Sequence, residues 1–340
     1  MARRKRVYES GTFSLPDPRG TGRRGHGRGL QRQDPHRATL RYVYEQSYMV
    51  SVPSEWTTMT YLITGATGNV GSLVVQRLIE RGYRPRVFVR APEKARARYG
   101  DRVDVFVGDL ADVTTLRPAL TGADALLLLN SGPSLAVQDE AAAKAAKAAG
   151  VEHLVKLSSM DARQDVGTGV WHARGESAIR ASGISFTFVQ PSGFMSNALF
   201  WARSIKAEGI VRTATGDGRI AFIHPQDIAD VATKALTTRV YAGESLPISG
   251  PEALSYAEMT AKIGTAIGKV LRLQQISEER ERRQMVESGD AAEVVAAHLS
   301  IYRAIREGRL AAVTDTVERV LGRKPITFDQ WAQENVTAFR

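Results

Sequence analysis

Three glycines, Gly65, Gly68 and Gly71, have the spacing in this 340-residue chain that points most directly to chemistry. They stand between a short apolar run, residues 61–63, and an amphipathic segment, residues 72–79. A strand, a glycine turn and a helix start in this order are typical of a dinucleotide site rather than an ordinary loop. We therefore predict that this turn binds a diphosphate through the following residues: Gly65, Thr67, Gly68, Asn69, Val70 and Gly71.

Each glycine has a separate physical reason. Gly65 leaves the strand with backbone angles that a side chain would resist. Gly68 lets the diphosphate approach the main chain, and Gly71 lets the first helix pack close to the sheet. The free N–H groups at the start of that helix, together with its positive dipole end, then favour an anion.

A basic residue stands where the second strand, residues 85–90, comes to its end. This residue is Arg90, and Lys94 follows it. A carboxylate at this place would accept from the ribose hydroxyls of NAD but repel a 2′-phosphate, whereas a guanidinium can bind that phosphate. The pattern favours NADP(H) as the cofactor; the competing interpretation is a solvated arginine.

Polar residues also follow the third, fourth and fifth strands. Asp109 and Leu110 come after the third strand, where an adenine ring would lie, although Asp109 also suits a helix cap. Because ligands of open α/β sheets bind at the carboxyl edge, we expect small polar residues there to contact the cofactor rather than only to form turns. These residues are Asn130, Ser131, Ser158 and Ser159.

His172 and Glu176 are four residues apart in a predicted helix, so they share one face. The imidazole of His172 is a candidate catalytic donor, and Glu176 is expected to orient its ring. No third ligand is evident, so we predict no metal site. The competing interpretation is a pair on the helix surface without chemistry.

Strands alternate with helices from Met59 to Pro191, which predicts an α/β fold with a doubly wound parallel sheet of the Rossmann type. The predicted domains are a disordered basic tail (residues 1–58), an NADP-binding core (residues 59–190) and a smaller, mixed C-terminal substrate lobe (residues 191–340), some of whose segments return to the core. We expect no parallel sheet in this lobe, and one helix over residues 327–339.

The loop after the sixth strand is expected to border the nicotinamide, with apolar side chains that suit a flat substrate. The competing interpretation is packing between the lobes, the commoner fate of such residues. The predicted substrate contacts are Phe194, Met195, Asn197 and Trp171.

Charge and composition limit the classes of protein. The net charge is +10, but residues 1–58 carry 11 Lys and Arg against 5 Asp and Glu. The rest is mildly basic, so we expect no nucleic-acid partner. Cysteine is absent and no apolar run is long enough to span a membrane, which favours the cytoplasm. The tail is interpreted as a basic arm, a targeting segment or a translation-start artefact before Met59, and the artefact or an inert tail is preferred.

From about Met59 onward the chain resembles the NmrA-like type of atypical short-chain dehydrogenase/reductase. The resemblance rests on TGATGNVG (residues 64–71), Arg90, GDL (108–110), LSS (157–159), ASGISFTFVQPSGFMSN (181–197) and HPQDIAD (224–230). It implies the extended Rossmann fold and NADP binding. The NmrA-like type includes quinone reductases, isoflavone-reductase relatives and redox-sensing regulators.

One departure from the wider family bears on the reaction. Short-chain dehydrogenases use a Tyr-x-x-x-Lys pair on the helix after the fifth strand, but residues 160–183 contain neither Tyr nor Lys. By the resemblance, His172 stands where isoflavone-reductase relatives carry a catalytic Lys. We therefore expect an NADPH-dependent reductase of a quinone-like or other conjugated aromatic molecule. The alternatives are a non-catalytic NADP(H) sensor that binds a protein and a pathway isomerase or cyclase; a homodimer is compatible with the sequence.

Overall fold

Seven parallel strands form the central sheet of the structure, a computed structural model that describes residues 59–340. Their order is β3–β2–β1–β4–β5–β6–β9, and this order confirms the predicted doubly wound α/β fold. The predicted tail, residues 1–58, lies outside the described residues. The strands are β1 (Tyr61–Thr64), β2 (Arg86–Val89), β3 (Asp104–Val107), β4 (Ala125–Leu128), β5 (His153–Leu157), β6 (Phe186–Pro191) and β9 (Ser245–Ile248).

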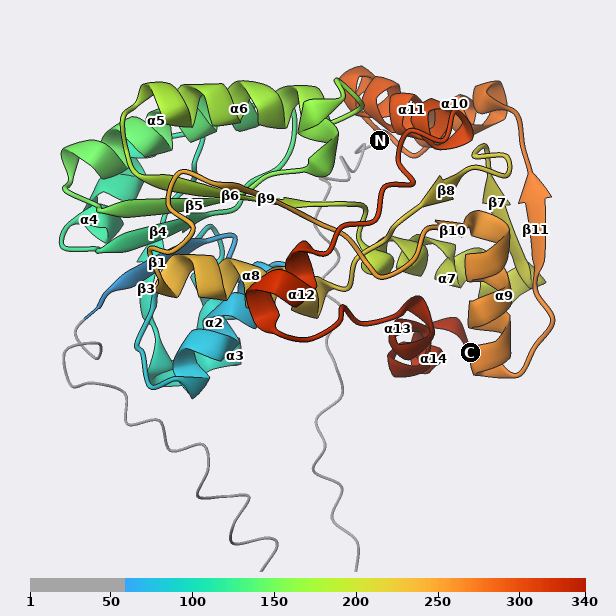
Figure 1. The fold of residues 1–340 in the computed structure, drawn as a ribbon, viewed down its shortest axis with the longest axis horizontal. Helices are drawn as coiled ribbons and strands as arrows, with labels where there is room; N and C mark the ends of the chain where they lie inside the picture. Colours follow the sequence, from blue (N-terminus) through green and yellow to red (C-terminus); the bar gives the residue numbers. More distant parts are fainter. Residues whose placement is uncertain (1–58) are drawn as a thin grey trace, which may run out of the picture. The chain divides into compact units, whose positions relative to one another are not determined.

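Helices cover both faces of this sheet (Figure 1). Strand residues alternate between the two sides, as the pleat requires: Ile63 packs with α2, α8 and α12, whereas Leu62 packs with α4, α5 and α6. One face carries α4 (Arg117–Leu120), α5 (Leu135–Ala148) and α6 (Gly169–Ala181); the other carries α2 (Gly71–Glu80), α3 (Pro92–Tyr99), α8 (Pro225–Thr237) and α12 (Thr316–Leu321). Single 3₁₀ turns in the connections are η2 (Gly100–Arg102), η3 (Val113–Leu116) and η4 (Met160–Arg163).

The C-terminal residues build a second apolar core, which includes Met195, Phe222, Tyr256 and Trp331. Its elements are η5 (Met195–Trp201), α7 (Ala202–Glu208), β7 (Ile210–Thr213), β8 (Arg219–Ile220), β10 (Leu254–Ser255), α9 (Tyr256–Ile267), β11 (Arg272–Gln275), α10 (Glu278–Glu287), α11 (Ala292–Arg306), α13 (Phe328–Glu334) and α14 (Val336–Phe339). The division at residue 190 stays a prediction.

Two expectations for this part of the chain are wrong. It does contain a parallel pair, because β7 pairs in parallel with β11. In addition β9 joins the main sheet beside β6, as a segment that returns to the core. The single helix expected over residues 327–339 is two helices, because Asn335 leaves helical geometry between them. Short strands with mixed composition carry too weak a periodic signal to reveal such long-range pairing.

The HPQDIAD segment begins α8 and ties the C-terminal residues to the sheet layer. Asp227 is fully buried; its carboxylate accepts from Arg323 at 2.6 Å and from the N–H of Ile326 at 2.7 Å. Asp230 accepts from Arg323 and from Arg77 of α2. These ion pairs hold α8 against α2 and fix the last connection of the chain.

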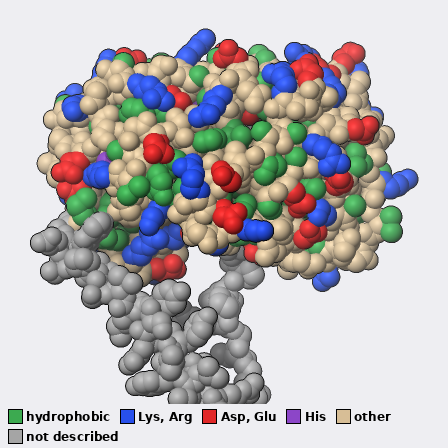
Figure 2. Space-filling model, viewed as in Figure 1, with side chains coloured by type: hydrophobic (Ala, Val, Ile, Leu, Met, Phe, Trp, Pro, Cys, Tyr) green, Lys and Arg blue, Asp and Glu red, His purple; other side chains and the backbone are tan. Residues whose placement is uncertain are grey.

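The described surface carries both signs of charge. Figure 2 shows Lys and Arg interspersed with Asp and Glu over the face in view. Within residues 59–340, no helix combines the length and the apolar character that crossing a bilayer requires.

Candidate active site

The glycine turn between β1 and α2 has the geometry of a phosphate cradle. Gly65 adopts a φ of +58°, and the N–H of Gly68 donates to its carbonyl at 3.0 Å. A Cβ on Gly71 would lie 2.2 Å from that carbonyl oxygen, so the position excludes any side chain. A Cβ on Gly68 would meet only this oxygen, at 3.2 Å, which leaves its other side open to a ligand.

The N-terminus of α2 suits an anion as well. The helix has no side-chain cap, and its first turn contains no acidic residue. Its dipole and N–H groups are therefore not neutralised locally. The phenol of Tyr99, at the end of α3, donates to the carbonyl of Ala66 at 2.6 Å and holds the turn in place. Burial raises the pKa of Tyr99 to about 12, so it stays a donor. The residues present thus fit the diphosphate of a dinucleotide.

Arg90 and Lys94 lie beside this turn, at the end of β2 and on α3, and both are exposed. Arg90 forms no ion pair within residues 59–340, whereas Arg77 and Arg323 are paired with carboxylates. A guanidinium without a protein carboxylate is available to a phosphate.

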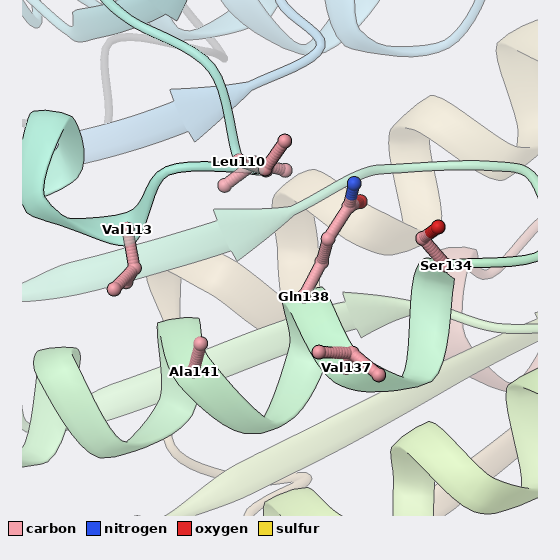
Figure 3. A pocket seen from close by; sticks show the side chains of 7 residues that line it. Leu110, Val113, Ser134, Val137, Gln138 and Ala141 are labelled. Carbon is pink, nitrogen blue, oxygen red and sulfur yellow. The ribbon is translucent and has the colours of Figure 1, made fainter.

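A cavity of about 290 Å³ lies between the loop after β3 and the start of α5. Leu110 and Gln138 point into the same space from opposite sides (Figure 3). The carboxylate of Asp109 accepts from the N–H of Ala111 at 2.9 Å, whereas the cap of η3 is Asp112, whose carboxylate accepts from the N–H of Thr114. The lining residues are Leu110, Ala111, Val113, Ser134, Val137, Gln138 and Ala141.

Asn130, after β4, turns into a buried polar cluster rather than outward, whereas its neighbour Ser131 is exposed. Its amide donates to Asp139 at 2.9 Å and to Gln138 at 3.2 Å, and its oxygen accepts from Lys156. Lys156 and Asp139 form an ion pair at 3.1 Å, and both side chains are fully buried. Burial lowers the pKa of Lys156 and raises that of Asp139, while their mutual attraction opposes both shifts.

A second buried group joins β5, β6 and α6. Ser158 donates to the carboxylate of Glu176, and Gln190 donates to the same oxygen at 2.7 Å. The guanidinium of Arg163 donates to Gln190 at 3.2 Å. Ser159 points elsewhere and caps η4 by accepting from the N–H of Asp161. The expectation that Glu176 orients His172 is wrong, because its carboxylate faces β5 and β6 instead.

His172 lies on α6; the residue as a whole is half-buried, and its Nδ1 atom is buried. Burial lowers its pKa to about 3, and the positive charge of Lys156 contributes to the shift. The imidazole is therefore neutral at ordinary pH. Its single N–H can donate one hydrogen bond, but the ring has no second proton to give to a substrate.

The loop after β6 reaches the glycine turn. The amide of Asn69 donates to the hydroxyl of Ser196 at 2.7 Å across this boundary. Asn197 is exposed, whereas Met195 is 1% exposed and belongs to the second core. Phe194 is partly buried, and its backbone pairs with Ile223.

Helix α11 closes against the connection between β5 and α6. The hydroxyl of Ser300 accepts from the N–H of Gly167 at 3.3 Å, and a Cβ on Gly167 would lie 2.4 Å from Ile301. Trp171 is partly buried at the start of α6, next to this contact. The C-terminal helices thus border the same edge of the sheet as His172.

Sequence reasoning missed the residues that support this edge: Lys156, Asp139, Gln190 and Arg163. One signal was available for Lys156, because a charged residue inside the apolar strand HLVKL must be buried and therefore paired. Gln190 gives the weaker version of the same signal inside FVQP. Asp139 gives none, because a charged residue near the start of a helix is usually solvated.

Comparison with known proteins shows the family to which the chain is similar. A family described as NAD(P)H-binding matches residues 65–239. The chain is 38% identical over 281 residues to the (4-alkanoyl-5-oxo-2,5-dihydrofuran-3-yl)methyl phosphate reductase of Streptomyces griseus, covering 82% of this chain and 98% of the relative. It is 35% identical over 281 residues to the NAD(P)H azoreductase of Xenophilus azovorans, with the same coverage.

The fold matches solved structures over nearly the whole described region. The NADPH-dependent quinone oxidoreductase of Escherichia coli, complexed with NADPH, superposes with a TM-score of 0.73 at 26% identity, covering 81% of this chain and 99% of that one. Together with the sequence relatives, this match confirms the predicted fold, the predicted family and NAD(P)H as the cofactor.

Proposed function

The chain belongs to the NAD(P)H-binding, NmrA-like family of atypical short-chain dehydrogenases/reductases, and from this premise we propose that it is an NADPH-dependent reductase of a quinone-like or other conjugated aromatic molecule. Relatives that are 38% and 35% identical to it over 281 residues are named reductases of a phosphorylated furanone and of azo compounds. These substrates share an electron-poor conjugated system.

The grip on the cofactor follows from the geometry of the turn. Gly65 to Gly71 would hold the diphosphate, with Arg90 and Lys94 on the 2′-phosphate. Leu110 and the cavity beside α5 would take the adenine. NADPH, when bound, supplies the hydride. Ser131 is exposed at the carboxyl edge of the sheet, and its hydroxyl would face the cofactor there.

The proposed class of hydride acceptor rests on the protonation state of His172. Its pKa of about 3 keeps the ring neutral, and residues 160–183 contain no Tyr. A neutral N–H can stabilise a developing oxyanion by a hydrogen bond but delivers a proton poorly. A quinone suits such a site, because hydride addition gives a stabilised anion that takes its proton from water. Phe194, Trp171 and Asn197 would border the flat acceptor.

Steady-state NADPH oxidation tests the proposal with a quinone, an azo compound and a simple aliphatic ketone. We expect turnover with the first two and little with the ketone, which needs a proton donor during hydride transfer. His172→Gln removes one hydrogen bond to the acceptor and should lower kcat about tenfold, and Ser177→Ala, on the exposed face of the same helix, should not. Equal rates with the ketone would contradict the proposal; tight NADPH binding without any turnover would favour the non-catalytic sensor.

A further inference from the structure

Two buried side-chain atoms stand out within residues 59–340, because they alone lack a hydrogen-bond partner. They are Oδ2 of Asp139 and Nδ1 of His172. Buried polar atoms are normally satisfied by protein or by ordered water. Two such atoms on neighbouring helices, α5 and α6, therefore point to a shared ligand between them.

The position of Gly175 relates both atoms to the same face of α6. A Cβ on Gly175 would lie 2.1 Å from Oδ2 of Asp139, so the carboxylate reaches the surface of α6 at this glycine. His172 is three residues earlier on α6, and residues three apart in a helix share a face. The carboxylate and the imidazole thus lie on the same face of α6, where the missing side chain of Gly175 leaves room for the carboxylate.

The surrounding charges decide what fits between them. The other carboxylate oxygen, Oδ1, already accepts from Lys156 at 3.1 Å and from Asn130 at 2.9 Å. The ammonium of Lys156 excludes a metal cation here, and Glu176, held by Ser158 and Gln190, adds no donor. Oδ2 of Asp139 needs a hydrogen-bond donor, and so does Nδ1 of His172 when the ring proton is on Nε2; a water molecule supplies two donors.

We infer that one ordered water bridges Asp139 Oδ2 and His172 Nδ1, and that Asp139 is thereby a positioning residue for His172. A water that donates to Nδ1 requires this nitrogen to be unprotonated. The single ring proton is then on Nε2, the nitrogen that is not buried. His172 is fixed as the tautomer that can donate a hydrogen bond to an acceptor oxygen; this last role rests on the proposed reductase function.

Two measurements that do not depend on enzymatic activity test the presence of the water and the tautomer of His172. A crystal structure of the wild-type protein with NADPH at high resolution should show a water within hydrogen-bond distance of both atoms. The ¹⁵N spectrum of histidine-labelled protein, with His172→Gln used for assignment, should show an unprotonated Nδ1 and a protonated Nε2. A protonated Nδ1, or no water at this place, would overturn the inference.

Gly175→Ala tests the positioning role with all charges kept, because its methyl group would displace Oδ2 of Asp139. We expect the ¹⁵N signals of His172 to shift towards a mixture of tautomers and kcat for quinone reduction to fall about tenfold, with KM for NADPH unchanged. Ser177→Ala is the matched control. Unchanged signals in folded Gly175→Ala would refute the role of Asp139. Expected spectra in a protein that reduces none of the acceptors would instead refute the proposed function and leave the water and tautomer standing.

Discussion

The two ends of the proposed cofactor site are built from different materials. The phosphate end, Gly65 to Gly71, consists of main chain, a helix N-terminus and glycines whose missing side chains make the space. The reaction end consists of buried side chains from β5, β6, α5 and α6, joined by hydrogen bonds and one ion pair.

The two ends therefore differ in their effect on the stability of the fold. Backbone dipoles at a helix start are already part of the fold, so an anion site there adds no buried charge. A buried lysine and aspartate are tolerated only while each has its partner. We therefore expect changes at the reaction end to act on folding, and changes at the phosphate end to act on binding.

The largest effect is expected at the buried ion pair. Lys156→Met leaves Asp139 without its counter-charge, and the free energy of unfolding should fall by roughly 3–5 kcal/mol, measured by urea denaturation. Lys156→Met combined with Asp139→Leu removes both charges and should recover most of that loss. A single variant as stable as the wild type would show that the pair is not a structural necessity.

Acid should destabilise the same strand. His153 on β5 is fully buried between the hydroxyls of Ser185 and Thr187, and burial lowers its pKa to about 4. The unfolded chain takes up this proton near pH 6.5. Stability from His153 is therefore complete above that pH and is lost as pH falls towards 4, by roughly 3 kcal/mol.

His153→Asn should remove about one proton from the pH dependence of unfolding in that window, measured by denaturation at a series of pH values. Ser185→Ala weakens a hydrogen bond but should keep the slope. The glycine turn contains no titratable side chain, so a slope unchanged in His153→Asn would remove this contrast between the two ends.

At the phosphate end, Gly68→Ala should weaken NADPH binding roughly 100-fold, or about 2.7 kcal/mol. The new methyl group meets only the carbonyl of Gly65, at 3.2 Å, so the fold should persist while the diphosphate is kept out. Titration calorimetry gives the affinity and thermal unfolding gives the stability. Gly82→Ala, outside the turn, strains a backbone with a φ of +84° and is the control for a loss of stability that leaves the phosphate site unchanged. If Gly68→Ala bound NADPH with wild-type affinity, the diphosphate would have to bind elsewhere than at this turn.

The smallest effect in this series concerns cofactor choice. Arg90→Gln should reduce the preference for NADPH over NADH by a factor of roughly 10 to 100, because charge-assisted hydrogen bonds contribute about 1.5–3 kcal/mol. Binding constants for both nucleotides measure it, and Lys94→Gln, one turn into α3, should have a weaker effect. An unchanged ratio of the two binding constants would show that Arg90 does not determine the preference for NADPH.

The phosphate end could be predicted because its signal is contiguous. Gly65, Gly68 and Gly71 are close in sequence, and the strand before them and the helix after them are readable from apolar periodicity. Arg90 and Leu110 follow from the ends of the next two strands. The alternation of strands and helices then determined the doubly wound sheet, since right-handed crossovers leave few other arrangements.

The hydrogen-bond and ion-pair partners at the reaction end could be seen only in the tertiary structure. Lys156 meets Asp139 from another element, and Glu176 faces Ser158 and Gln190 rather than His172, four residues away on its own helix. Packing likewise brings β11 beside β7, where Arg272 pairs with Ile210, a residue far from it in the sequence. Local spacing fixes backbone conformation, whereas the partner of a buried charge depends on which side chains packing brings within hydrogen-bond distance.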